Sequence, residues 1–227
     1  MNEKNRPESQ ARVLHRLRVT YSKLEAGRFL SHLDLCNLMG RAIRRIDLPV
    51  AFSEGFTPRP RLAFGPPLPL FVEGENEQVD IDLTAKLDPA EIIHRLNDTL
   101  VEGVRTLEAS YVDPRSPSIT ASIDRAHYVV TGREVGICFP QTRLDQVLAS
   151  PSIVIEKTSK GIKKAVEIRP SIFSLLEIDR GFRAVLSAAP SRTLNIFDLL
   201  TVLDPGFTIQ EGFRYRVVRS MMTSQGT

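Results

Sequence analysis

The chain has 227 residues, of which 42% are hydrophobic and 25% charged, a balance typical of soluble globular proteins with one large or two small domains. No apolar run approaches the ~20 residues that cross a bilayer, and the polar first residues lack the apolar core of a secretory signal, so we expect a cytoplasmic protein. Cys36 and Cys138 stand far apart without C-x-x-C spacing, which argues against a disulfide framework or an iron–sulfur site. We expect no cofactor.

Charge is spread unevenly along the chain. Residues 1–61 hold 12 Lys and Arg against 6 Asp and Glu, residues 62–113 hold 3 against 11, and residues 114–227 hold 15 against 10, within a net charge of +3. This order predicts either a polyanion-binding face with a separate acidic surface or an uneven solvated surface.

Residues 1–12 are polar and predict a disordered leader. Residues 13–113 then predict strands where apolar and polar residues alternate and helices where apolar residues recur every three or four positions. The expected strands cover 16–22, 61–65, 78–84 and 104–111, and the expected helices cover 31–46, capped by Ser31, and 88–97, capped by Asp88.

Residues 114–122 predict a linker, after which the order nearly repeats over 123–220, followed by a tail over 221–227. The second set of expected strands covers 126–131, 152–157, 165–169, 172–178, 181–187 and 213–219, with helices over 142–148 and 194–203. The pattern favours an α+β fold of two tandem ferredoxin-like (βαββαβ) units with antiparallel sheets, the alternative being one fused α+β domain.

Arginines gather at the end of the first helix and in the loop after it. Arg41, Arg44 and Arg45 have helical spacing, and Arg59 and Arg61 follow from a proline-stiffened loop. Arginine forks match phosphate geometry, so these five residues would suit an RNA backbone if they converge; the alternative is a solvated helix end.

Two other turns carry candidate contacts. Ser53-Glu54-Gly55-Phe56 could present backbone N–H groups to an anion, or simply be a turn that needs Gly55, and we expect Phe56 to anchor the loop in the core rather than stack on a base. Lys160, Lys163 and Lys164 predict a basic hairpin tip that either grips a nucleic acid or keeps a turn soluble.

The histidine and aspartate residues show only weak patterns for a metal site or for acid–base catalysis. His15, His32, His94 and His127 are scattered without ligand spacing, so we expect no metal site, and His32 with Asp34 fits helix capping better than a catalytic pair. Asp80 and Asp82 would share one face of a strand, which we expect to be a charged edge strand rather than a divalent-ion site.

The motifs F-L-S-H-L-D-L (29–35), R-A-I-R-R (41–45) and L-P-V-A-F-S-E-G-F-T-P-R-P-R-L-A-F (48–64), with K-G-I-K-K-A-V-E-I-R-P (160–170), resemble a radical SAM-linked family of uncharacterised bacterial proteins. Members of that family, which is a domain of unknown function, are fused to or encoded beside radical SAM proteins. The resemblance implies a radical SAM protein as partner, and the family has no established activity or catalytic residues that could be carried over to this chain. This chain lacks the three-cysteine motif of such an enzyme.

Three functions follow as hypotheses. The first is a non-catalytic RNA-binding or substrate-presenting accessory protein for a radical SAM enzyme in RNA modification or processing. In this hypothesis the acidic segment 62–113 docks the enzyme. The second is a metal-independent endoribonuclease in which His32 is the general base. The third is a protein-only adaptor of the radical SAM enzyme.

Overall fold

The helices begin at residues whose side chains satisfy free backbone groups. In the computed structural model, which describes residues 15–54, 56–134, 136–159, 161–208 and 214–224, Ser31 and Asp34 form a capping box at the start of α1 (His32–Arg45). The Asp34 N–H donates to Ser31 Oγ at 3.2 Å, and the Ser31 N–H donates to the Asp34 carboxylate at 3.1 Å. Asp88 caps α2 (Pro89–Asn97) and Asn195 caps α5 (Ile196–Leu203). The first two starts confirm the expected caps.

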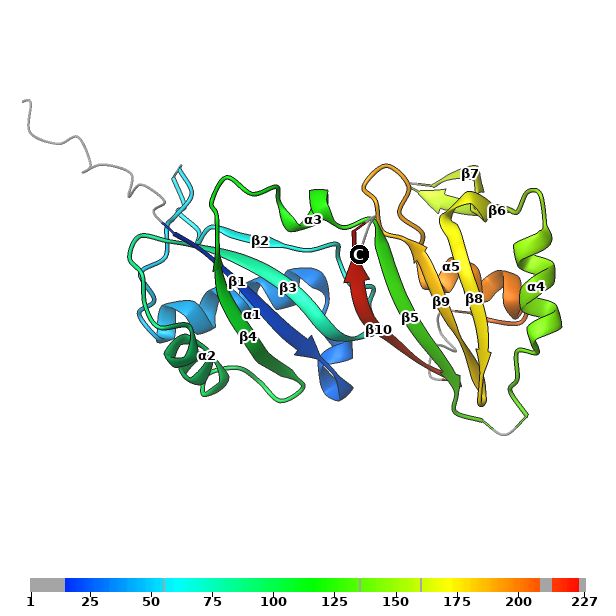
Figure 1. Cartoon of the computed structure of the whole chain (residues 1–227), viewed down its shortest axis with the longest axis horizontal. Coiled ribbons are helices and arrows are strands. Elements are labelled where there is room, and N and C mark those ends of the chain that lie inside the picture. The colour runs from blue at the N-terminus through cyan, green and yellow to red at the C-terminus, as the bar shows by residue number, and fades with distance from the viewer. Residues whose placement is uncertain (1–14, 55, 135, 160, 209–213, 225–227) are drawn as a thin grey trace, which may run out of the picture.

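The strands form one large sheet and one small ladder (Figure 1). Within the described ranges, the large sheet has eight strands in the order β4-β1-β3-β10-β5-β9-β8, and β2 also pairs with β3. Their bounds are β1 His15–Lys23, β2 Leu62–Phe64, β3 Glu73–Leu83, β4 Val104–Val112, β5 Arg125–Gly132, β8 Ile172–Ile178, β9 Gly181–Ser187 and β10 Tyr215–Thr223. Strands β6 (Val154–Ser159) and β7 (Ile162–Glu167) pair only with each other in the part described.

The chain is therefore an α+β protein with a mostly antiparallel sheet and few helices. The remaining helices are α3 (Ile119–Ser122) and α4 (Gln141–Ala149), with 3-10 turns over Glu25–Phe29 and Arg169–Ser171. No helix in the described residues has both the length and the apolar character needed to cross a membrane. The expected leader over 1–12 lies outside the described residues, as does the tail from 225, whereas the last strand runs on to Thr223.

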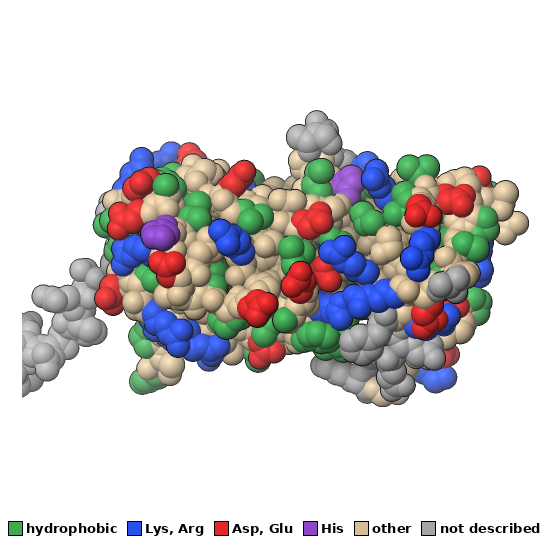
Figure 2. All heavy atoms as spheres, turned by 90° about the horizontal axis from the view of Figure 1, so that it is seen from below, with side chains coloured by type: hydrophobic (Ala, Val, Ile, Leu, Met, Phe, Trp, Pro, Cys, Tyr) green, Lys and Arg blue, Asp and Glu red, His purple; other side chains and the backbone are tan. Residues whose placement is uncertain are grey.

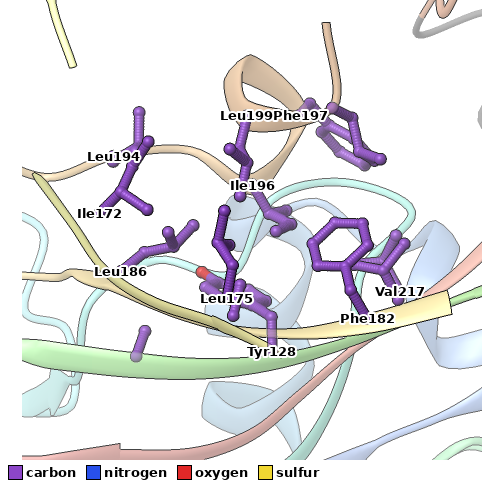
Figure 3. Packing of buried hydrophobic residues seen from close by; sticks show 14 of the residues in the cluster. Tyr128, Ile172, Leu175, Phe182, Leu186, Leu194, Ile196, Phe197, Leu199 and Val217 are labelled. Atoms are coloured by element: carbon purple, nitrogen blue, oxygen red, sulfur yellow. The ribbon is translucent and has the colours of Figure 1, made fainter. Parts of the chain in front are cut away.

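Two apolar clusters fill the space between the sheet and its helices. The first joins β1 and β3 to α1 and α2, through residues such as Val19, Ile81 and Ile43. The second joins β5, β9 and β10 to α4 and α5, and Figure 3 shows Tyr128, Phe182 and Leu199 among its members. The first cluster lies within the first half, whereas the second also includes Leu68 and Val72 of the first half, and one sheet runs through both halves.

Several boundaries differ from expectation for identifiable reasons. Strand β3 begins at Glu73 rather than near residue 78, because Glu73 and Gly74 pair in parallel with Val218 and Arg219 of β10. The expected linker contains α3, which Ser118 caps and whose Ile119 is buried in the second cluster. Strand β7 begins at Ile162 because it pairs residue by residue with β6.

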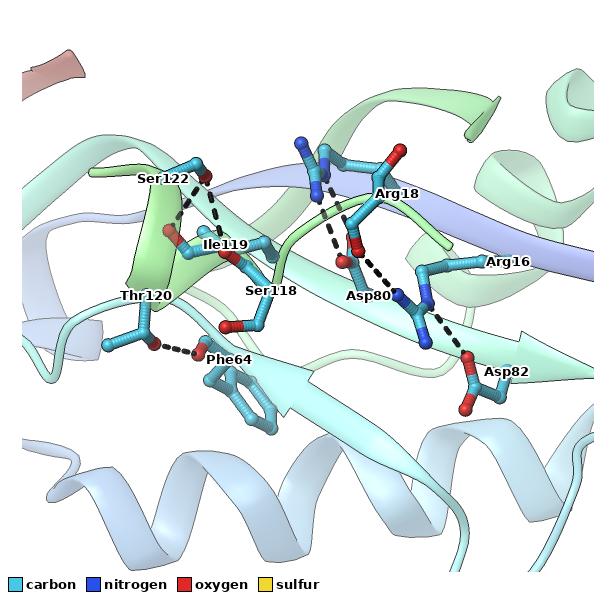
Figure 4. Close-up of polar contacts among 10 residues, drawn as sticks. Arg16, Arg18, Phe64, Asp80, Asp82, Ser118, Ile119, Thr120 and Ser122 are labelled. Carbon is cyan, nitrogen blue, oxygen red and sulfur yellow. Dashed lines mark hydrogen bonds and ion pairs between the residues drawn. The ribbon is translucent and has the colours of Figure 1, made fainter. Parts of the chain in front are cut away.

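The acidic strand is interior, so the expectation of a charged edge strand is wrong. Strand β3 pairs with β1 on one side and with β2 and β10 on the other. Figure 4 shows Arg18 and Arg16 of β1 reaching Asp80 and Asp82, their partners in register. Arg18 Nε and Nη2 donate to Asp80 at 2.8 and 3.0 Å, and Arg16 Nε donates to Asp82 at 3.0 Å. Cross-strand ion pairs therefore neutralise these carboxylates.

A buried ion pair lies where the two halves meet. Arg219 of β10 and Glu77 of β3 are 2% and 3% exposed, and Arg219 Nε donates to Glu77 at 2.8 Å while Nη2 donates to the carbonyl of Pro66 at 2.7 Å. Burial by itself lowers the pKa of Arg219, but the Glu77 charge and hydrogen bonds outweigh it and raise that pKa. Lys23, also buried beside Glu77, donates to the carbonyl of Leu30 at 3.0 Å, and burial lowers its pKa to about 8.

We expect Glu77→Gln to lower the free energy of unfolding by about 3–5 kcal/mol, because it leaves the buried Arg219 charge without its carboxylate. Urea unfolding at neutral pH measures the change. The control is Glu156→Gln, which breaks an exposed pair with Lys163 and should cost less than about 1 kcal/mol. Equal effects of the two substitutions would show that the junction of β3 and β10 does not depend on the pair of Glu77 and Arg219.

Candidate nucleic-acid interface

A surface groove lies between helix α1 and the loop that precedes β2. Its volume is about 490 Å³. One wall comes from α1 at helical spacing, and the other from the 57–60 loop and β2. The lining residues are Leu33, Cys36, Asn37, Gly40, Arg41, Arg44, Thr57, Pro58, Arg59, Pro60, Leu62 and Phe64. We call this hollow the arginine groove.

Three of the five predicted arginines line the arginine groove: Arg41 and Arg44 from α1 and Arg59 from the loop. All three are exposed, and none forms an ion pair with any carboxylate in the described residues. Arg45 is exposed on α1 but is not part of the lining. Arg61 pairs with Asp82, its Nε 3.4 Å from the carboxylate, and so its charge is partly neutralised.

The loop that carries Arg59 is braced by its own backbone. The Ser53 N–H donates to the carbonyl of Arg59 at 2.8 Å, and the Arg59 N–H donates to Ser53 Oγ at 3.1 Å. The Arg61 N–H then donates to the carbonyl of Ala51 at 2.8 Å. Ser53 thus holds the loop closed, and Gly55 lies outside the described residues.

Phe56 stands at the tip of this loop and is fully exposed, at 110% of its reference area. The expectation that it anchors the loop in the core is therefore wrong. It directly precedes Thr57, which lines the arginine groove. An aromatic ring held in solvent by a braced loop is available to stack on a flat partner, such as a nucleic-acid base.

The basic hairpin lies away from the arginine groove. Figure 1 shows β6 and β7 at the opposite end of the molecule from α1. Lys163 pairs with Glu156 across the hairpin at 2.7 Å, Lys164 is exposed on β7 opposite Lys157, and Lys160 lies outside the described residues. On the face in Figure 2, Lys and Arg side chains alternate with Asp and Glu rather than forming one basic band.

His32 is exposed at the first residue of α1. Its Nε2 is 3.6 Å from Cys36 Sγ, and its ring meets Phe64 edge-on with centroids 5.5 Å apart. Within the described residues no carboxylate forms an ion pair with His32. Burial raises the pKa of the Cys36 thiol, so it stays protonated near neutral pH and is a poor nucleophile.

Sequence reasoning missed the rest of the helical wall. Leu33, Asn37 and Gly40 stand at spacings of three and four residues that continue to Arg41 and Arg44, and this spacing was the available signal. Gly40 is notable because a glycine inside a helix costs stability, yet a Cβ added here would meet no atom within 4 Å. A methyl group at this position would therefore meet open space.

The fold and the groove define an α+β protein with a cationic surface site. A family model described as an uncharacterised protein conserved in bacteria (DUF2344) matches residues 16–197, and the chain belongs to that family. No curated protein matches the chain. The matched region contains α1, the braced loop and the arginine groove.

We expect Gly40→Ala to raise the free energy of unfolding by about 0.5–1 kcal/mol, because alanine is a better helix former and the added methyl group meets no neighbour. Thermal and urea unfolding measure the gain. Gly27→Ala is the opposite case, since its Cβ would lie 2.4 Å from the carbonyl oxygen of Gly103 and should destabilise the fold. A loss of stability in Gly40→Ala would mean that the helix wall has no room.

Proposed function

We propose that this chain binds single-stranded RNA in the arginine groove and presents it to a partner enzyme, without performing chemistry itself. The observation that carries the proposal is that Arg41, Arg44 and Arg59 line one groove, without an ion pair at contact distance in the described residues, beside the fully exposed ring of Phe56. Cations hold a phosphate backbone and an exposed aromatic ring stacks on a base, which is the usual combination in single-strand binding.

The arginines of the sheet differ from those of the arginine groove, and the difference supports RNA binding in the groove. Arg16, Arg18, Arg216 and Arg219 pair with buried carboxylates of β3, where they stabilise the sheet. The groove arginines have no such structural partner in the described part of the chain. Guanidinium groups without partners are free to form the two-pronged hydrogen bonds that match phosphate oxygens.

The absence of a catalytic role in this proposal follows from the chemistry around His32. A general base needs a substrate within hydrogen-bond reach and is commonly oriented by a second group. His32 contacts a protonated thiol and a phenyl ring, and it does not line the arginine groove. We therefore place chemistry on a partner.

The proposed partner is a radical SAM enzyme that modifies or processes RNA, and its support is the resemblance of the 29–64 motifs. Four of the eleven acidic side chains of segment 62–113 are not available for docking that enzyme. Glu73, Glu77, Asp80 and Asp82 are buried, and each forms an ion pair with an arginine of this chain.

We also propose that each half is a ferredoxin-like unit. The strand order β4-β1-β3-β2 in the first half and β10-β5-β9-β8 in the second supports this, because in both halves the first and third strands are central. On this interpretation β6 and β7 are an insertion, and the parallel pairing of β3 with β10 fuses two units into one sheet.

Arg44→Gln should weaken binding to a single-stranded RNA and flatten its salt dependence. Three phosphate contacts predict an affinity that falls roughly 20-fold between about 50 and 200 mM salt, and losing one contact reduces the log–log slope by about 0.7. Fluorescence anisotropy with a labelled oligonucleotide measures both. Arg45→Gln is the matched control, since it removes the same charge from the same helix outside the arginine groove. Identical behaviour of the two variants, or no binding at 50 mM salt, would leave a protein-only adaptor as the better account.

Phe56→Ala should weaken RNA binding about 5- to 100-fold, the range of one base–aromatic stack, without changing the salt slope. Stability should stay within about 0.5 kcal/mol because the ring is fully exposed. Phe56→Tyr is the conservative control and should bind nearly as the native chain does. Unchanged affinity in Phe56→Ala would remove stacking from the proposal and leave the arginines.

A further inference from the structure

A second hollow lies at the seam between the two halves and shares no lining residue with the arginine groove. Its volume is about 430 Å³, within the range of small-molecule pockets. One wall is the crossing segment Pro66–Pro69, and the other is the loop from Ser187 to Asn195. Tyr128 of β5 and Arg219 of β10 lie between the walls. We call this hollow the seam pocket.

The charge in the seam pocket is already balanced. Arg219 donates to both oxygens of Glu77 and to the carbonyl of Pro66. An anionic ligand would therefore compete with Glu77 for this guanidinium, and a cationic ligand would meet it directly. The electrostatics favour a neutral ligand.

Tyr128 supplies an uncommitted donor. Burial raises the pKa of its hydroxyl against the opposing charge of the neighbouring Arg219, so it keeps its proton at neutral pH. Within the described residues that proton has no acceptor. The hydroxyl of Ser187, another lining residue, likewise makes no hydrogen bond in the described part of the chain. Hydroxyl donors that line a pocket favour a ligand that offers an acceptor.

The walls of the seam pocket are rich in proline and leucine, which favours a compact apolar ligand over an extended peptide. Pro66, Pro67, Pro69 and Pro190 contribute ring surfaces, and Leu68 and Leu194 add apolar area. Prolines have no N–H group, so an extended peptide laid along these walls would find few backbone partners. A compact ligand that needs contact area and one or two hydrogen bonds suits them better.

We propose that the seam pocket binds a neutral, mostly apolar small molecule that carries a carbonyl-type acceptor, with Tyr128 donating to that acceptor. The ligand would touch both halves of the chain at once, because Pro66–Pro69 belongs to the first half and the 187–195 loop to the second. Its binding would stabilise the junction of β3 with β10. The proposal is independent of RNA binding.

Nile red is a suitable probe because it is neutral and flat, carries a carbonyl group and fluoresces in apolar surroundings. We expect saturable, salt-independent binding at one site on the full chain. Tyr128→Phe should weaken it about 5- to 10-fold, the effect of one hydrogen bond. Thr193→Phe adds a ring at an exposed lining position, and binding should fall at least tenfold. Because it also removes the hydrogen bond that Thr193 Oγ1 donates to the carbonyl of Ala189 at 2.9 Å, Thr193→Val, which loses that bond without adding a ring, is its matched control and should bind nearly as the native chain does.

Phe56→Ala is the control for non-specific adsorption, since it removes an exposed ring elsewhere and should leave Nile red binding unchanged. The anionic dye 8-anilinonaphthalene-1-sulfonate, of similar size, should bind more weakly than Nile red. The proposal is overturned by absence of saturable Nile red binding, by unchanged affinity in Thr193→Phe, or by tighter binding of the anionic dye. Should Tyr128→Phe fail to fold, the Thr193→Phe result still decides.

Discussion

The buried pair between Arg219 and Glu77 is the interaction on which the rest of the architecture depends. It joins β10, the last strand, to β3 of the first half, next to the point where Val218 and Arg219 run parallel to Glu73 and Gly74. The second apolar core also takes in Leu68 and Val72 of the first half, so packing and the charge pair join the two halves at the same place. A charge pair this deep is stable only when its hydrogen bonds are satisfied, and the carbonyl of Pro66 completes them.

The same pairing logic explains which charges remain available at the surface. Carboxylates of strand β3 form ion pairs with arginines of two neighbouring strands, which are Arg16 and Arg18 of β1 and Arg216 and Arg219 of β10. The sheet therefore pairs four of the eleven acidic side chains of segment 62–113 internally. The arginines of the groove have no carboxylate partner in the described residues and stay exposed, which is why they, rather than the more numerous arginines of the sheet, form a candidate polyanion site.

The crossing segment Pro66–Pro69 has two consequences. The carbonyl of Pro66 accepts a hydrogen bond from Arg219, and the segment forms one wall of the seam pocket. Prolines suit both tasks, because they hold an extended path without needing partners for N–H groups. The arginine groove and the seam pocket are thus separate sites, one on the helix side of the first half and one where the two halves meet.

Local chemistry in the sequence determined the helices and most strands. Ser31 with Asp34, and Asp88 with Pro89, mark helix starts through contacts within three residues, so no distant partner is needed to recognise them. The hairpin of β8 and β9 likewise follows from alternation on either side of one turn. The spacing of Arg41 and Arg44 predicts that both lie on one helix. Arg59 and Arg61 are predicted in the loop after that helix.

Only the tertiary structure decided which of those charges are free and how the halves are joined. The polar run from Glu73 looks like a loop, and it becomes strand because β10, more than 140 residues later, pairs with it. Asp80 and Asp82 alternate as an exposed strand would, yet they are interior because arginines on a neighbouring strand neutralise them. Phe56 is apolar but lies at a loop tip that the braces between Ser53 and Arg59 hold in solvent. For Glu73, Asp80 and Asp82 the deciding contact joins residues that are far apart in the chain, and local sequence patterns carry no record of such contacts. For Phe56 the contact is local but depends on the closed geometry of the loop, which residue types alone do not specify.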